Sequence, residues 1–129
     1  MPDHLGAPLP APLFNRLAII GLGLIGSSLA RAARARNLAA AIVAIDASET
    51  VRDRVTQLNL ADTVTGDTAN GVRDADFIIL CVPVGACGSV AEAMRPGLAK
   101  GAIISDVGSV KGSIVAQIAP HLPANVHFV

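Results

Sequence analysis

Residues 17–26 read Leu-Ala-Ile-Ile-Gly-Leu-Gly-Leu-Ile-Gly, and this stretch decides the fold. Its four leading apolar residues predict a buried strand at 17–20, and a Gly-x-Gly-x-x-Gly loop follows directly. Residues 24–36 then change to the spacing of an amphipathic helix, which Asn37 would end. The residues expected on the buried face of this helix are Ile25, Leu29, Ala32 and Ala33.

The same alternation of strand and helix continues along the chain. We predict further strands at residues 42–45, 63–65, 77–82, 102–105 and 126–129, a helix capped by Ser48, and helices at 86–95 and 113–119. With right-handed crossovers these elements form an α/β fold, a doubly wound parallel Rossmann sheet of strand order 3-2-1-4-5-6. Residues 1–15 are proline-rich and aperiodic, so we divide the chain into an N-terminal arm (1–15) and a dinucleotide-binding domain (16–129).

Composition excludes several classes of protein. Hydrophobic residues make up 52% of the 129 residues, which is enough for a packed core. Ten lysines and arginines balance ten acidic residues, and Trp and Tyr are absent, so we expect no nucleic-acid partner. Glycine, serine and proline interrupt each apolar run, so neither a membrane span nor a secretory signal is expected. Cys81 and Cys87 are too few for a metal site, and a reduced, cytoplasmic protein is the expectation.

The glycine loop predicts a phosphate site. In such a loop Gly21 makes the tight turn, Gly23 lets the backbone approach a pyrophosphate, and Gly26 lets the helix pack against the sheet. The amides of Leu24 and Ile25 would then face an anion at the start of the helix. The alternative is a glycine-rich turn with no bound nucleotide.

Asp46 stands at the end of the second predicted strand, twenty residues after Gly26. A carboxylate in this place accepts hydrogen bonds from the adenosine ribose and repels a 2′-phosphate. Residues 47–49 contain no arginine that could pair with such a phosphate. The sequence therefore predicts NAD as cofactor in preference to NADP. The alternative is that Asp46 caps the following helix.

Three stretches, residues 19–29, 80–84 and 104–111, resemble the prephenate/arogenate (cyclohexadienyl) dehydrogenase family of tyrosine biosynthesis. The third stretch, Ile-Ser-Asp-Val-Gly-Ser-Val-Lys, is the most specific of the three. Composition and spacing alone lead only to an NAD-binding domain. The resemblance implies a cytoplasmic oxidoreductase that oxidises prephenate or arogenate, with hydride going to NAD and carbon dioxide leaving as the ring becomes aromatic.

The resemblance also implies roles for individual residues. Ser109 matches a catalytic serine that lies between the nicotinamide and the substrate hydroxyl and orients them. The plainer interpretation, that Ser109 caps the next helix, is compatible with this role. Val82 and Pro83 would line the cofactor groove, or they could simply end a strand. Lys111 belongs to the matching motif, with its role open.

Here the sequence departs from the family pattern. The family's general base is a histidine in a His-Pro-x-x-Gly stretch after the sixth strand, and the printed sequence does not contain that stretch. His127 lies within the predicted strand, and His121 and His4 are expected in solvent, so none is assigned as the base. We expect the helical dimerisation domain and the substrate-binding arginines to lie beyond Val129, the full-length enzyme to be a homodimer, and the 129-residue chain alone to be inactive.

Two other interpretations stay open. One is another Rossmann reductase of the hydroxyacid dehydrogenase type, and the other is a non-catalytic NAD-sensing module. The resemblance further predicts that Val126, Phe128 and Val129 form an apolar outer face that a second domain covers.

Overall fold

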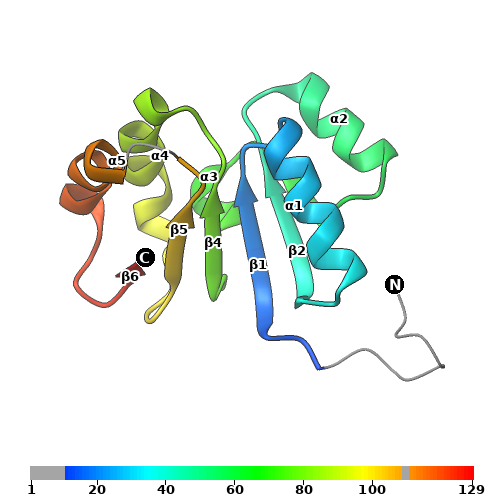
Figure 1. Ribbon diagram of the computed structural model, residues 1–129, viewed down its shortest axis with the longest axis horizontal. Helices are drawn as coiled ribbons and strands as arrows, with labels where there is room; N and C mark the ends of the chain where they lie inside the picture. Colours follow the sequence, from blue (N-terminus) through cyan, green and yellow to red (C-terminus); the bar gives the residue numbers. More distant parts are fainter. Residues whose placement is uncertain (1–10, 109–110) are drawn as a thin grey trace.

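The computed structural model describes residues 11–108 and 111–129. Strand β1 (Phe14–Ile20) lies between β2 (Ala39–Ile45) and β4 (Phe77–Leu80), parallel to both. The remaining strands are β3 (Thr63–Thr65), β5 (Ile103–Asp106) and β6 (His127–Phe128). Together they form one parallel sheet in the order β3-β2-β1-β4-β5-β6, as predicted (Figure 1).

Helices join these strands in alternation. They are α1 (Leu24–Ala35), α2 (Glu49–Gln57), α3 (Thr68–Gly71), α4 (Cys87–Met94) and α5 (Lys111–Ile118). Short 3-10 turns at Val84–Ala86, Arg95–Gly97 and Ala119–His121 complete the connections. Figure 1 shows α1 and α2 beside β1 and β2, and α4 and α5 at the opposite end of the sheet. Among the described residues, no helix has the length and apolar character that a bilayer span requires.

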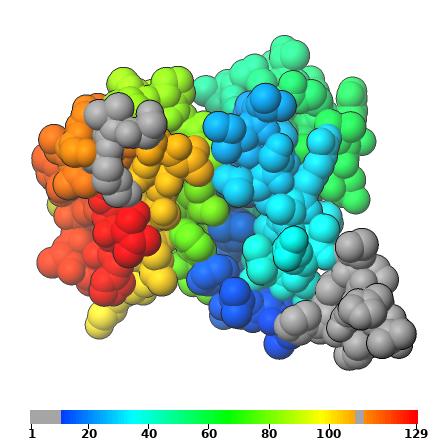
Figure 2. Space-filling model, viewed as in Figure 1, coloured from blue at the N-terminus to red at the C-terminus, as the bar shows by residue number. Residues whose placement is uncertain are grey.

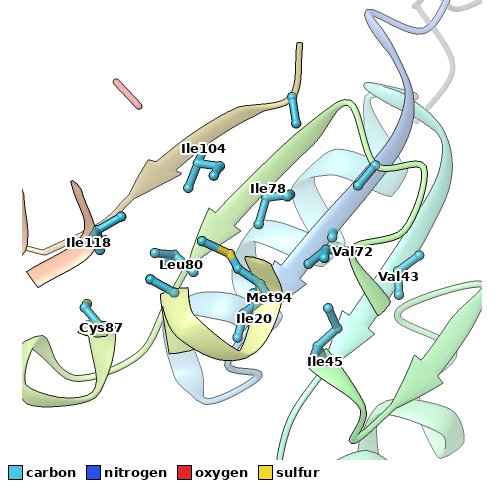
Figure 3. Close-up of a cluster of buried hydrophobic side chains, with 14 of the residues drawn as sticks. Ile20, Val43, Ile45, Val72, Ile78, Leu80, Cys87, Met94, Ile104 and Ile118 are labelled. Atoms are coloured by element: carbon cyan, nitrogen blue, oxygen red, sulfur yellow. The ribbon is translucent and has the colours of Figure 1, made fainter. Parts of the chain in front are cut away.

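Two apolar clusters cover the two faces of the sheet. Because side chains alternate along a strand, Leu17 and Ile19 of β1 belong to one cluster, and Ala18 and Ile20 to the other. The first cluster is closed by α1 and α2, and the second by α3, α4 and α5. Figure 3 shows the second cluster, in which Met94 of α4 lies near Leu80 and Ile20 of the sheet.

The first strand starts earlier than the predicted residue 17, inside the segment taken as an arm. The N–H groups of Leu13 and Phe14 donate to the carbonyl of Leu38 at 3.0 and 3.1 Å. The Phe14 ring packs edge-to-face on Phe77, with ring centroids 4.6 Å apart. These contacts join residues far apart in sequence, so the local pattern does not reveal them.

The buried face of α1 also differs from the prediction. Gly26, Ala30 and Ala33 face the sheet, whereas Ile25 is 57% exposed and Ala32 is also exposed. Small residues face inward because α1 lies close against the sheet.

Strand β2 begins at Ala39, three residues before the predicted start at 42, and the other boundaries shift by two residues or fewer. The short helix α3 was not predicted. Its single turn begins at Asp67, whose carboxylate accepts a hydrogen bond from the Asn70 N–H at 3.1 Å. At the other end of the chain, Val126 and Phe128 pack partly against the second cluster, and Val129 is 62% exposed. The expected apolar outer face at β6 is therefore smaller than predicted.

Candidate functional site

The three glycines of the β1–α1 loop meet three different surroundings. Gly21 has φ of +95°, and a Cβ there would collide with the Cys81 carbonyl oxygen. A Cβ on Gly26 would collide with the carbonyl oxygen of Gly21. A Cβ on Gly23 would meet nothing within 4 Å. Gly21 and Gly26 are therefore required by the fold, while Gly23 leaves open space in front of the backbone.

The Asp46 carboxylate joins the glycine loop to the turn after β2. Its Oδ2 accepts a hydrogen bond from the Leu22 N–H at 2.9 Å, and its Oδ1 accepts one from the Ser48 N–H at 2.9 Å. Ser48, as predicted, caps α2, since its Oγ accepts from the Val51 N–H at 3.3 Å. The alternative in which Asp46 is the helix cap is wrong. Each carboxylate oxygen keeps a second lone pair for a ligand hydroxyl.

Two arginines of α2 contact this backbone, and the sequence analysis missed both. Arg52 Nη1 donates to the carbonyls of Asp46 and Ala47 at 2.8 and 3.0 Å. Arg54 Nη2 donates to the carbonyl of Leu22 at 2.9 Å. The Arg54 contact spans 32 residues, so no local spacing signals it. Residues 47–49 contain no arginine, but Arg52 of α2 reaches back to the same turn through these hydrogen bonds.

Two cavities open at the carboxyl ends of the strands, on either side of the glycine loop's exposed backbone. The first has a volume of about 410 Å³ and contains Asp46. It is lined by Ile20, Gly21, Gly23, Ile45, Asp46, Ala47, Thr68, Cys81, Val82, Pro83, Ala86 and Val90. It therefore brings together four elements that are separate in sequence: the glycine loop, the end of β2, α3 and the segment after β4.

The second cavity has a volume of about 500 Å³ and lies between the start of α1 and the loop after β5. It is lined by Gly23, Leu24, Ile25, Gly26, Cys81, Val82, Pro83, Val84, Val107 and Gly108. In Figure 2 the blue atoms of α1 face the gold atoms of the β5 region across a hollow in the surface. Ser109, which follows Gly108 in the sequence, lies outside the described residues.

All the other predicted site residues line one or both cavities. Gly23, Val82 and Pro83 line both cavities. Leu24 and Ile25 line the second cavity with side chains that are 87% and 57% exposed. The arrangement thus has a polar end at Asp46 and an apolar end at Leu24, Ile25 and Val107.

Acid–base groups are scarce in this lining. Cys81 lines both cavities, and burial raises the pKa of its thiol from 9.0 to about 11. Burial, and secondarily the charge of Asp106, also raises the pKa of Cys87. His127 is exposed on β6 and His121 is half-buried after α5, and neither lines these cavities. His121 is thus less exposed than expected. Of the described residues, none that lines the second cavity titrates near neutral pH.

Known proteins share this chain's sequence and fold. The domain family described as prephenate dehydrogenase, nucleotide-binding domain, matches residues 29–129. A cyclohexadienyl dehydrogenase of Zymomonas mobilis is 51% identical over 114 residues, which is 88% of this chain and 39% of that protein. The chain therefore spans about two fifths of the length of this relative.

Two solved structures show the same fold. A prephenate dehydrogenase of Aquifex aeolicus, in complex with hydroxyphenyl propionate and NAD+, superposes with a TM-score of 0.77 at 25% identity, over 87% of this chain and 40% of that one. An arogenate dehydrogenase of Synechocystis superposes with a TM-score of 0.75 at 28% identity, over 82% of this chain and 37% of that one.

Proposed function

This chain belongs to the family of prephenate dehydrogenase nucleotide-binding domains, and we propose that it binds NAD as the cofactor-binding part of a prephenate or arogenate dehydrogenase. The observation that carries the proposal is the open face of Gly23 beside the Asp46 carboxylate, at the carboxyl end of a parallel sheet. This is where doubly wound sheets bind their ligands. A second domain would supply the rest of the enzyme, including the surface that forms a homodimer.

The two cavities fit the two ends of a dinucleotide. Adenosine fits the first cavity, where Asp46 accepts hydrogen bonds from the ribose hydroxyls. The pyrophosphate fits over Gly23, with the N–H groups of Leu24 and Ile25 at the positive end of α1. Nicotinamide fits the second cavity, whose apolar lining of Val82, Pro83 and Val107 would exclude water from the ring.

Asp46 favours NAD over NADP in this arrangement. A 2′-phosphate on the ribose would lie against the carboxylate, and like charges close together repel. Arg52 is turned toward the backbone of this turn, since its Nη1 donates to the carbonyls of Asp46 and Ala47. It is also absent from the lining of the first cavity.

The reaction is an oxidative decarboxylation in which bound NAD supplies the hydride acceptor. The residues of this chain orient the cofactor and shield it from water. Ser109 follows the second-cavity residues Val107 and Gly108, and we assign it the positioning of the substrate hydroxyl against the nicotinamide. The hydroxyl proton needs a base to accept it, and we propose that this base comes from outside the described lining of the second cavity.

The proposal can be tested with a domain exchange. The 114 matching residues of the Zymomonas mobilis enzyme would be replaced by this chain, and NADH formation followed with prephenate and with arogenate. We expect NAD-dependent turnover with at least one of the two. The matched control carries Gly23→Val and should be inactive although folded. A folded chimera that binds NAD but oxidises neither compound would contradict the proposed reaction.

A further inference from the structure

A third cavity of about 290 Å³ lies between α1 and α2, behind the glycine loop. It is lined by Gly23, Leu24, Ser27, Arg31, Arg54 and Leu58. Arg54 and Arg31 both contribute a positive charge to it, and Arg54 Nη2 also donates to the Leu22 carbonyl at 2.9 Å. Arg54 belongs neither to the first nor to the second cavity.

We propose that Arg54 is a positioning residue for the pyrophosphate of the cofactor, because it orients the peptide between Leu22 and Gly23. The inference rests on the proposed binding of NAD and extends it to a residue outside the cofactor cavities. Arg54 would act through the loop backbone, without touching the dinucleotide.

Side chains from three elements hold the two peptides on either side of Leu22. The N–H of Leu22 donates to Asp46 Oδ2 at 2.9 Å, which fixes the preceding peptide. The carbonyl of Leu22 accepts from Arg54 Nη2 at 2.9 Å and from Ser27 Oγ at 3.0 Å, which fixes the following peptide. The Leu22 side chain is fully buried, so the residue cannot shift as a whole.

The orientation of the peptide between Leu22 and Gly23 decides whether its N–H or its carbonyl oxygen faces the phosphates of the cofactor. In a trans peptide the C=O and N–H bonds point in opposite directions. With the Leu22 oxygen turned toward Arg54 and Ser27, the Gly23 N–H points away from both side chains. A phosphate is attracted by an N–H group and repelled by a carbonyl oxygen, so a reversed peptide would oppose binding.

Because Gly23 is a glycine, the peptide between Leu22 and Gly23 could reverse easily unless hydrogen bonds hold it in place. Gly23 has no side chain, so its φ and ψ angles are less restricted than those of other residues. The glycine that leaves room for the pyrophosphate is therefore also a source of backbone freedom. Two donors on the Leu22 oxygen restrict this freedom from the far side of the loop.

The test uses the 129-residue chain and measures dissociation constants by calorimetry for NAD+ and ADP, and by NMR titration for adenosine. Arg54→Ala and Ser27→Ala should each weaken NAD+ and ADP about threefold, because the other donor remains on the Leu22 oxygen. The double variant should weaken them about thirtyfold, more than the two single effects combined. Adenosine, which has no phosphate, should bind all variants equally.

Arg31→Ala is the matched control, because it removes the same charge from the same cavity, whereas the side-chain donors to the Leu22 carbonyl are Arg54 and Ser27. It should bind NAD+ as the parent chain does. The urea midpoint of Arg54→Ala should stay near that of the parent chain, since Arg54 is exposed and Val55 anchors α2.

Three further outcomes would overturn the positioning role of Arg54, and a fourth would overturn the proposed function. Unchanged NAD+ binding in the double variant, or an equal loss for adenosine, would overturn the positioning role. An equal loss in Arg31→Ala would show that only the charge matters, which also overturns it. A parent chain that is folded but binds no NAD+ would instead refute the proposed function.

Discussion

The two ends of the proposed cofactor site are built by different interactions. At the β1–β2 end, side chains fix the backbone through hydrogen bonds: Asp46 and Arg54 hold Leu22, and Arg52 holds the turn after β2. At the β4–β5 end, the side chains that line the second cavity are apolar apart from the Cys81 thiol. Leu24 and Val107 are 87% and 42% exposed there.

This difference suggests that the two ends of the site have different tasks in binding the cofactor. A rigid polar end can recognise the adenosine diphosphate part, which is identical in every NAD molecule and takes no part in the chemistry. An apolar end with exposed residues can accept both the nicotinamide and a covering surface from elsewhere, because exposed apolar patches mark interaction sites. We therefore expect this chain to fix the cofactor by its adenosine half and to leave the reacting half incomplete.

The largest effect should come from Gly23→Val at the polar end. Its side chain would occupy the space of the pyrophosphate and abolish NAD binding, while the ligand-free fold keeps its melting temperature. Calorimetry and thermal unfolding measure both properties. Gly26→Ala is the contrasting variant: it should lower the melting temperature strongly, because its Cβ collides with the Gly21 carbonyl. If Gly23→Val binds NAD normally, the loop is only a turn.

A second prediction concerns Cys81, where the two cavities meet. Its pKa of about 11 is two units above 9.0, so at pH 8 its thiolate, and hence its rate of alkylation by iodoacetamide, should be about a hundredfold lower than for an unperturbed cysteine. Because burial raises this pKa, the protonated thiol stabilises the fold below pH 9, and that contribution is lost as the pH rises toward 11. Mass spectrometry after timed alkylation distinguishes Cys81 from Cys87. Alkylation at the rate seen in urea would show that the thiol is not buried.

A smaller effect is expected for Asp46→Asn. The amide keeps an oxygen that accepts from the Leu22 N–H but removes the charge that repels a 2′-phosphate. The ratio of the dissociation constants of NADP+ and NAD+ should fall about tenfold, which corresponds to about 1.4 kcal/mol. Titration of both cofactors into both proteins measures the ratio. An unchanged ratio would remove Asp46 as the selector.

The smallest effect is expected at the apolar end. Leu24→Ala should change the free energy of unfolding by less than about 0.5 kcal/mol, because the side chain is exposed. The matched substitution Leu22→Ala, two residues earlier, should cost about 2–5 kcal/mol, because Leu22 is fully buried. Urea unfolding compares them. A large cost at Leu24 would mean that the apolar end is packed within this chain.

Local signals in the sequence predict the strands and the glycine loop, and the rule of right-handed crossovers then predicts the observed strand order. Apolar runs mark buried strands, and the tight turn at Gly21 and the close helix at Gly26 leave a readable glycine pattern. The contacts of Arg54 with Leu22 and of Phe14 with Phe77 depend on the folded geometry and leave no local pattern. The buried face of α1 was misassigned because small residues, rather than large apolar ones, face the sheet where packing is closest.

The central claim is that this chain alone holds the elements that bind NAD. Calorimetric titration of NAD+ and NADP+ into the folded 129-residue chain tests it most directly. We predict saturable one-to-one binding of NAD+, tighter than that of NADP+, and no NADH formation when prephenate or arogenate is added. A folded chain that binds neither dinucleotide would contradict the claim.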